Sequence, residues 1–320
     1  MLRYMRKPVF GHRLVRPLFY LVALAITVPL AFKAWERSQP DNGFDLDELA
    51  VPADEIVTGG PGRDDIPALI EPEAVPISES DYAADEPVLA ITLNGSARAY
   101  PVRILRWHEI VNDRLSGEPI TVTWCPLCNT GVIYRGRVSG ERRVFGVSGL
   151  LYRNNLLMYD HETESLWSQL QGEAISGPMR GRKLEALAFR QTHLGDWVSA
   201  HPETTVVTPE TGYRRDYSSD PYAAYHRSVG GSEKLADRDL VVGVVLAGKA
   251  KAYPFSELAA RGEQGRIRDS LAGQSFILEY DATTNGFHFE VEDGTQPRTM
   301  LSYWFAWKDF HPDTAVFGTK

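Results

Sequence analysis

The chain has 320 residues, of which 43% are hydrophobic and 24% are charged, and its formal net charge at pH 7 is −8. This length suffices for one large domain or two modest domains with their own cores. The charge is uneven, because residues 1–37 carry a net +6 and the remainder therefore carries −14. An acidic body repels phosphate backbones, so we expect no nucleic-acid partner.

The N-terminus predicts a membrane anchor. Residues 1–16 form a basic segment, and residues 17–35 hold an apolar run (18–32) that is about 22 Å long as a helix, a marginal span. A cleaved signal peptide is the alternative, although no small-x-small cleavage site follows cleanly. In both cases the positive charges stay in the cytoplasm. We therefore expect a single-pass inner-membrane protein with a cytoplasmic N-terminus and a periplasmic or otherwise extracytoplasmic body.

An extended lead-in rich in acidic residues and proline covers residues 36–87, and a duplicated body follows it. Three blocks of the body recur in the same order: 88–105 matches 241–258, 113–125 matches 269–281, and 197–207 matches 307–317. This recurrence indicates two related repeats in a pseudo-symmetric body.

The repeats have predicted boundaries at residues 88–211 and 240–320, and a tyrosine-rich connector spans residues 212–239. Glycine-punctuated strands dominate both repeats, and helical patterns are short, near 102–111, 194–200, 255–260 and 304–310. We predict a β-rich α+β fold. The first repeat is longer and holds the only two cysteines, whose counterparts in the second repeat are Asp281 and Thr284. Any chemistry therefore belongs to the first repeat.

The strongest chemical signal is the pair Cys125 and Cys128, in a strand that runs into a tight turn and then a second strand. No helix follows the pair, unlike in thioredoxin-like sites. A Cys-Pro-x-Cys knuckle, closed by a left-handed Asn129 or Gly131, can present both thiolates to one metal. A copper, zinc or iron site needs further ligands, and the candidates are His108, Met158 and His161, with the carboxylates of Glu109, Asp160 and Glu164.

Three other roles for the cysteines remain open. The pair can act as a thiol–disulfide redox couple, or it can be an inert structural disulfide outside the cytoplasm. Cys125 can also be a nucleophile with His108 as its base, as in a cysteine-dependent hydrolase, although no oxyanion-hole element is visible. If the cysteines are structural, we expect a non-catalytic binding or assembly module at the membrane surface.

Two loops are candidates for ligand contact. The first (146–170) contains Tyr152, Asp160 and Trp167, which we consider as cofactor-binding residues. Its alternative interpretation is a turn in which Asp160 caps the backbone and the aromatic residues belong to the core. The second loop (212–226) is rich in tyrosine and can line the site or pack at an ordinary contact. We expect a small-molecule or protein partner at these loops.

Four motifs resemble one family: WHEIVND (107–113), TWCPLCNTGVIYRG (123–136), the run from FGVSG to AISGP (145–178) and DYSSDPYAAY (216–225). Over residues 88 to about 230 the chain resembles the bacterial and archaeal family catalogued as domain of unknown function 3179. The family has no established activity, so the resemblance implies a site but no reaction. It also implies an arginine where this chain has His161, and a threonine in some relatives at the position of Cys128. Both departures favour Cys125 with His108 as the core of a site.

Overall fold

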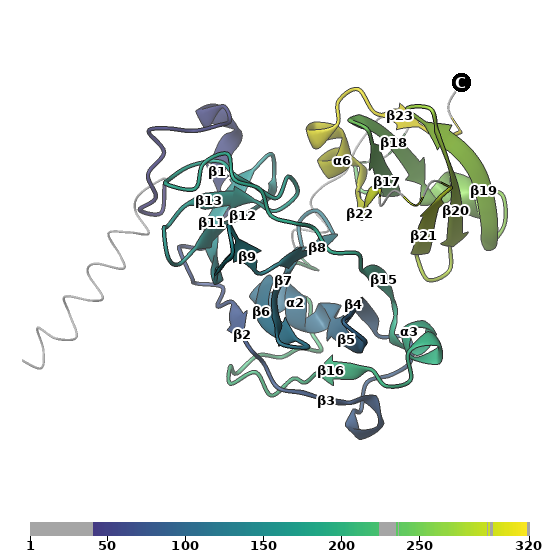
Figure 1. The fold of residues 1–320 in the computed structure, drawn as a ribbon, viewed down its shortest axis with the longest axis horizontal. Helices are drawn as coiled ribbons and strands as arrows, with labels where there is room; N and C mark the ends of the chain where they lie inside the picture. The colour runs from purple at the N-terminus through teal and green to yellow at the C-terminus, as the bar shows by residue number, and fades with distance from the viewer. Residues whose placement is uncertain (1–40, 224–234, 236, 293, 295–296, 319–320) are drawn as a thin grey trace, which may run out of the picture.

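Figure 1 shows a computed structural model of the chain, which describes residues 41–223, 235, 237–292, 294 and 297–318. The described part is rich in β-strands and its helices are short, which confirms the predicted β-rich character. The predicted anchor (17–35) lies outside the described residues. Within them, no helix is both long and apolar enough to cross a membrane.

A five-stranded sheet with the order β15-β4-β5-β16-β3 begins the body. Its central hairpin turns at Asn94 and Gly95, which both have positive φ, as expected for an Asn-Gly turn. Strand β5 also pairs in parallel with β16. The bounds are β3 (Ala74–Pro76), β4 (Pro87–Leu93), β5 (Ser96–Pro101), β15 (Arg190–His193) and β16 (Thr205–Val207).

Two short helices flank this sheet. Helix α2 (Val102–His108) follows β5 directly, since Pro101 cannot donate a further ladder bond and suits the start of a helix. Helix α3 (Leu194–Ala200) follows β15. Two 3₁₀ turns, η1 (Ala53–Glu55) and η2 (Ile77–Glu79), lie in the lead-in.

The sheet that carries the cysteines has the order β2-β6-β7-β8. It consists of β2 (Leu69–Ile70), β6 (Ile110–Leu115), β7 (Glu118–Cys125) and β8 (Thr130–Arg135). Residues 119–125 of β7 are all buried, which explains why this strand reads as a continuous run of apolar residues and threonine. The sheet is thus covered on both faces around the cysteines.

A third sheet contains most of the loop region predicted to contact a ligand, in the order β1-β11-β12-β13-β14. Its strands are β1 (Ile56–Thr58), β11 (Phe145–Tyr152), β12 (Asn155–Asp160), β13 (Leu166–Ser168) and β14 (Glu173–Ala174). A small hairpin of β9 (Arg137–Val138) and β10 (Glu141–Arg142) precedes it. Much of the predicted loop is therefore strand.

The C-terminal part holds two more sheets, ordered β22-β17-β18-β23 and β19-β20-β21. The bounds are β17 (Leu240–Leu246), β18 (Lys249–Pro254), β19 (Gln264–Leu271), β20 (Gln274–Asp281), β21 (Gly286–Val291), β22 (Arg298–Tyr303) and β23 (Ala315–Val316), with helices α5 (Phe255–Ala259) and α6 (Trp304–Phe310). Strand β18 pairs in parallel with β23, as β5 does with β16. The four α-helices in the described part of the chain (α2, α3, α5 and α6) lie where the sequence predicted helical patterns.

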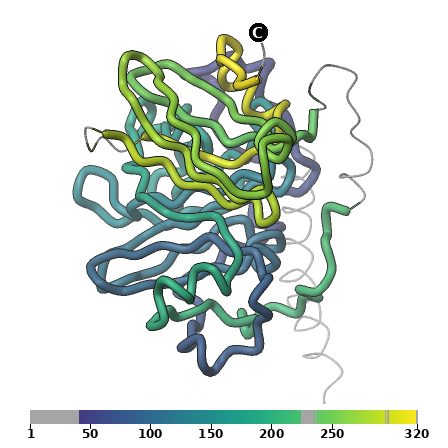
Figure 2. Tube along the Cα trace, turned by 90° about the vertical axis from the view of Figure 1, so that its right-hand side faces the viewer, coloured from purple at the N-terminus to yellow at the C-terminus, as the bar shows by residue number. Residues whose placement is uncertain are grey.

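The C-terminal strands pack against the rest of the body, and the described part of the connector runs along one side (Figure 2). One apolar cluster joins the parts, since it contains Cys125, Cys128 and Trp167 together with Trp304 and Trp307. The cysteine turn therefore lies near the junction of the N-terminal and C-terminal parts.

Candidate functional site

The cysteines occupy the ends of a tight β-hairpin. Cys125 is the last residue of β7 and pairs with Thr130, the first residue of β8, while residues 126–129 form the turn. Asn129 has φ 55°, so Asn129 and not Gly131 takes the left-handed conformation. Gly131 has a different role, because a Cβ there would come within 2.6 Å of the Leu89 side chain. The predicted strand–turn–strand is confirmed.

Both sulfur atoms are shielded from solvent. Cys125 is 1% exposed and Cys128 is 0% exposed, and no disulfide joins them in this structure. The Cys128 thiol donates to the carbonyl oxygen of Asn154 at 3.1 Å, and the Cys128 carbonyl accepts from the backbone N–H of Tyr303 at 2.9 Å. Burial, and secondly the neighbouring Cys125, raise the pKa of the Cys128 thiol well above its usual value. Cys128 is therefore a thiol at neutral pH.

A buried polar network supports the hairpin. The Gln169 amide donates to Thr123 Oγ1 at 3.2 Å and to the Thr130 carbonyl at 3.1 Å. The Asn155 amide donates to Gln169 Oε1 at 2.8 Å, and Asn155 Oδ1 accepts from the Leu170 N–H at 3.2 Å. Because these groups satisfy one another, the network fixes the turn without an unpaired amide.

His108 lies at the end of α2 with both ring nitrogens engaged. Nδ1 is 2.7 Å from the Pro67 carbonyl oxygen, and Nε2 is 2.7 Å from the Tyr217 hydroxyl. A carbonyl only accepts, so Nδ1 carries the proton and Nε2 accepts from Tyr217, whose oxygen is 2.5 Å from Thr211 Oγ1. Burial lowers the pKa of His108, against the bond to Pro67. His108 is thus a neutral anchor for Tyr217, and its lone pair is not free to serve as a base for Cys125.

Glu109, the next residue, is buried and strained. It follows α2 with φ 58° and ψ −31°, a conformation that non-glycine residues rarely adopt. Its carbonyl accepts from the N–H of Trp124, so Glu109 lies opposite the residue before Cys125. Burial raises the pKa of Glu109 from 4.5 to about 7, although the Tyr222 hydroxyl donates to Oε1 at 2.6 Å and opposes this.

Tyr222 links the connector to Glu109. Burial raises the pKa of Tyr222 most, and the charge of Glu109 and the hydrogen bond to it raise the pKa further. Glu109 in turn is bonded through its carbonyl to Trp124, the residue before Cys125. Three segments far apart in sequence therefore converge: 108–109, 125–128 and 217–222. The described part of the connector is tied inward through Tyr217 and Tyr222, and residues 224–226 of the predicted contact loop lie outside the described residues.

The residues predicted as metal ligands are only partly brought together. Cys125, Cys128 and Met158 belong to one buried cluster, whereas His161 is exposed and stacks on Tyr159 with ring centroids 5.1 Å apart. Within residues 41–223, 235, 237–292, 294 and 297–318, no group of three or more His, Cys, Asp or Glu side chains is placed to hold a metal ion. This arrangement offers a dithiol rather than a complete metal shell.

The residues predicted to bind a cofactor have structural partners. Asp160 Oδ1 accepts from the Thr163 N–H at 2.8 Å, and Oδ2 accepts from the Trp167 indole at 2.9 Å. This is the capping turn considered as the alternative, with Trp167 in the core. Tyr152 packs edge-on against Phe310, with centroids 5.5 Å apart.

Sequence reasoning missed the specific roles of Tyr217 and Tyr222, and treated Glu109 only as one carboxylate among several. Tyr222 and Glu109 are 113 positions apart, so no local pattern relates them. The sequence nevertheless offered one signal for their importance: Glu109 and Tyr222 each lie in one of the four motifs that resemble the family.

The fold and the site define a β-rich protein with a buried Cys-x-x-Cys hairpin beside a buried carboxylate. The chain belongs to the family described as protein of unknown function (DUF3179), whose model matches residues 63–314. No curated protein and no solved structure matches the chain.

Proposed function

We propose that this chain is a membrane-anchored extracytoplasmic protein in which Cys125 and Cys128 cycle between dithiol and disulfide, with Glu109 as the acid–base group. The basic N-terminus and the following apolar run support the location. The converging segments around the cysteine turn support the chemistry.

The observation that carries the proposal is the placement of Glu109. Burying a carboxyl group is unfavourable, and so is φ 58° at a residue other than glycine or asparagine. A glutamine would equally accept the hydrogen bond from Tyr222. Strain and a pKa near neutrality that coincide at one residue are typical of functional sites. A carboxyl group of pKa about 7 is suited to accept a proton from a neighbouring thiol and return it.

The reaction follows from this arrangement. Glu109 takes the proton of Cys125, and the Cys125 thiolate attacks a disulfide of the partner, which releases one partner thiolate. Cys128 then displaces the second partner sulfur, so that an internal disulfide forms and the partner leaves as two thiols. The two electrons pass from the cysteines to the partner, and the two thiol protons pass to its sulfurs. Both sulfurs are buried, so a partner reaches them only when the side chains around the hairpin move.

Complete burial of both sulfurs favours a second candidate, a non-catalytic binding or assembly module with structural cysteines. Its partner, a small molecule or a protein, would contact the loops at 146–170 and 212–226. Metal ligation by the thiolates has less support, because no third His, Cys, Asp or Glu among the described residues joins the two cysteines in a metal-binding group.

The body is, we infer, a pair of pseudo-symmetric α+β repeats. Tyr100 and Arg98 donate to Asp113 Oδ2 at 2.7 Å each, and Tyr253 and Lys251 donate to Asp269 Oδ2 at 2.8 and 2.7 Å. Trp197 packs on His201 at 4.0 Å and Trp307 on His311 at 4.2 Å between ring centroids. Together with the shared parallel pairing, these matches support the repeat boundaries 88–211 and 240–320.

The test is the rate at which the full-length chain, purified from an oxidising compartment and then reduced, reacts with oxidised glutathione between pH 5 and 9. We expect an inflection near pH 7 that Glu109→Gln removes, and no reaction in Cys125→Ser. Tyr217→Phe is the matched control and keeps the inflection. Reaction only after denaturation would favour the binding module. Stoichiometric metal that is lost in Cys125→Ser would replace the redox pair by a metal site.

A further inference from the structure

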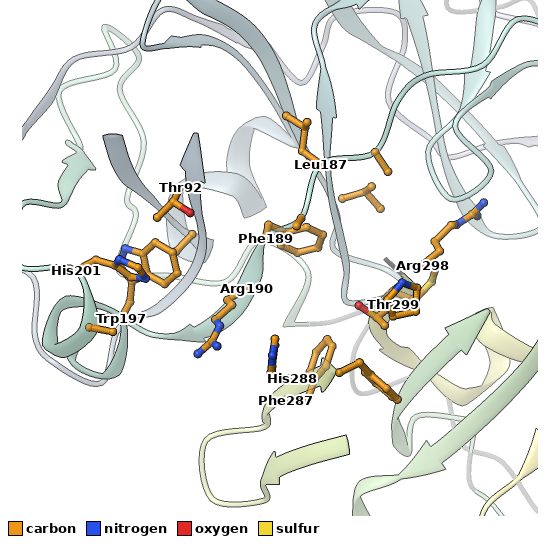
Figure 3. Close-up of a pocket in the computed structure, with 18 residues that line it drawn as sticks. Thr92, Leu187, Phe189, Arg190, Trp197, His201, Phe287, His288, Arg298 and Thr299 are labelled. Carbon is orange, nitrogen blue, oxygen red and sulfur yellow. The ribbon is translucent and has the colours of Figure 1, made fainter. Parts of the chain in front are cut away.

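A second site lies away from the cysteines, in a cleft of about 500 Å³ between β15 and α3 on one side and β21 and β22 on the other. This volume is in the range of small-molecule sites. Figure 3 shows its lining, which comes from both the N-terminal and the C-terminal parts. Apolar side chains form much of the wall: Val132, Leu187, Phe189, Phe287, Phe289 and Met300.

The charges of the lining have one sign. Arg190, Arg298, His201 and His288 line the cleft, and among the described residues no Asp or Glu belongs to its lining. The chain as a whole has more acidic than basic residues, so the described lining of the cleft differs in charge from the average composition of the chain. An excess of positive charge in a concave, partly apolar site attracts anions.

The basic groups differ in how they are engaged. Arg298 donates to the Leu170 carbonyl and is held by it. Among the described residues, the side chain of Arg190 has no hydrogen-bond or ion-pair partner, and Figure 3 shows it beside His288. Burial lowers the pKa of His288, Arg190 lowers it further, and Glu279 and Glu290 oppose both. Two basic groups from separate parts of the chain thus lie close enough to interact, while Glu279, the cross-strand partner of His288, and Glu290 offset part of their charge.

Aromatic surface lies beside these groups. Trp197 and His201 are packed together with ring centroids 4.0 Å apart on the α3 side of the cleft. Phe189 and Phe287 also line the cleft, next to Arg190 and His288 in the chain. A flat apolar group can pack against such rings while a charged group reaches the arginine.

We propose that this cleft binds a small organic anion, whose carboxylate or phosphate group pairs with Arg190 and His288 and whose flat apolar part packs on the aromatic wall. The overall acidic charge disfavours a polyanion and the volume limits the ligand to a small molecule. The proposal does not depend on the cysteine chemistry, because neither cysteine lines the cleft.

The experiment is calorimetry on the full-length chain with benzoate, phenyl phosphate and uncharged benzyl alcohol, against a detergent blank. We expect saturable binding of at least one anion, at least tenfold tighter than that of benzyl alcohol. Arg190→Glu should weaken it at least tenfold, whereas Arg182→Glu, the same charge change at an exposed arginine outside the cleft, should leave it unchanged. Cys125→Ser should bind as the wild type does, which separates this site from the redox proposal.

Three results would overturn the proposal. Neither anion binds more tightly than benzyl alcohol, or Arg190→Glu binds as the wild type does, or the two arginine variants weaken binding equally. The last result would show a response to net charge alone.

Discussion

The hairpins β7–β8 and β20–β21 have the same backbone and different chemistry. In each, a four-residue turn joins a closing pair, Cys125 with Thr130 and Asp281 with Gly286. In each, the fourth turn residue is an asparagine in the left-handed conformation, with φ 55° at Asn129 and 54° at Asn285. At the second turn, Asp281 caps the chain by accepting from the Thr283 N–H at 2.9 Å.

The first hairpin replaces that cap with two buried thiols. The second hairpin shows that a turn of this shape closes without cysteines, so turn geometry does not explain the pair. The first turn also contacts Asn154 through the Cys128 thiol, and the buried carboxyl residue Glu109 is bonded to Trp124 beside it. The comparison therefore indicates that Cys125 and Cys128 are present for a role of their buried thiols and not to close the turn.

The largest difference in stability between the two hairpins is expected when their closing residues, Cys125 and Asp281, are exchanged. Cys125→Asp places a carboxylate in a site that is 1% exposed and should lower the free energy of unfolding by about 3–5 kcal/mol. Asp281→Cys loses a turn cap and an exposed hydrogen bond from Gln264, together about 1–2 kcal/mol. Urea unfolding monitored by tryptophan fluorescence measures both. Equal losses would mean that burial does not distinguish the two turns.

The free energy of unfolding should depend on pH through the titration of Glu109. Its pKa is about 7 in the folded protein against 4.5 unfolded, so the folded state binds the proton more tightly. Its contribution to stability is complete below pH 4.5 and falls by about 3 kcal/mol as the pH rises to 7, then stays constant.

The wild-type minus Glu109→Gln difference isolates this slope. His311 in the C-terminal part acts in the opposite direction, because burial lowers its pKa to about 4, and its contribution rises with pH up to 6.5. Unfolding curves at pH 5 and pH 8 suffice, and an unchanged slope in Glu109→Gln would contradict the assignment.

Substituting the two connector tyrosines one at a time should distinguish the contact to Glu109 from the contact to His108. Tyr222→Phe removes a hydrogen bond to a carboxyl group, so it should cost about 1.5–3 kcal/mol at pH 8 and raise the pKa of Glu109 further. Tyr217→Phe removes a bond to neutral His108 and should cost about 1 kcal/mol, with the pKa of Glu109 unchanged. Carboxyl-carbon NMR titration reads the pKa in each variant. A shift in both would mean that the two contacts form one coupled network.

The smallest effect should be the same in both hairpins. Asn129→Ala and Asn285→Ala each place alanine at positive φ and should each cost about 1 kcal/mol, while glycine at either position should be tolerated. Thermal unfolding checks the four variants. Unequal losses would show that the turns share their shape but not their backbone strain.

Local features were predictable from the sequence to different degrees. The Asn-Gly turn, the strand before Cys125 and the short helix after Pro101 follow from residue preferences over a few positions. The capping turn at Asp160 was foreseen only as an alternative, because Asp-x-x-Thr serves equally as a turn and as a loop that carries a site. The distinction depends on Trp167, whose indole reaches back to Asp160.

Long-range contacts of the site could not be predicted. The bond between Tyr222 and Glu109 joins the connector to the end of α2, and no periodicity encodes such a meeting. His161 also illustrates the limit: Met158 is buried, yet three residues later the chain has left the strand and the imidazole faces solvent. A list of potential ligands within one segment therefore overestimates how many converge.

The backbone at Glu109 has a consequence for how this protein tolerates mutation. Glycine relieves both the left-handed strain and the buried charge at that position, so a library selected only for folding should accumulate it. The same library selected for the protein's biological role should discard it. At position 109, selection for folding would then favour glycine and selection for the biological role would favour glutamate, whereas at most other buried sites both favour the same residue. The residue found there in natural sequences therefore shows which selection is stronger.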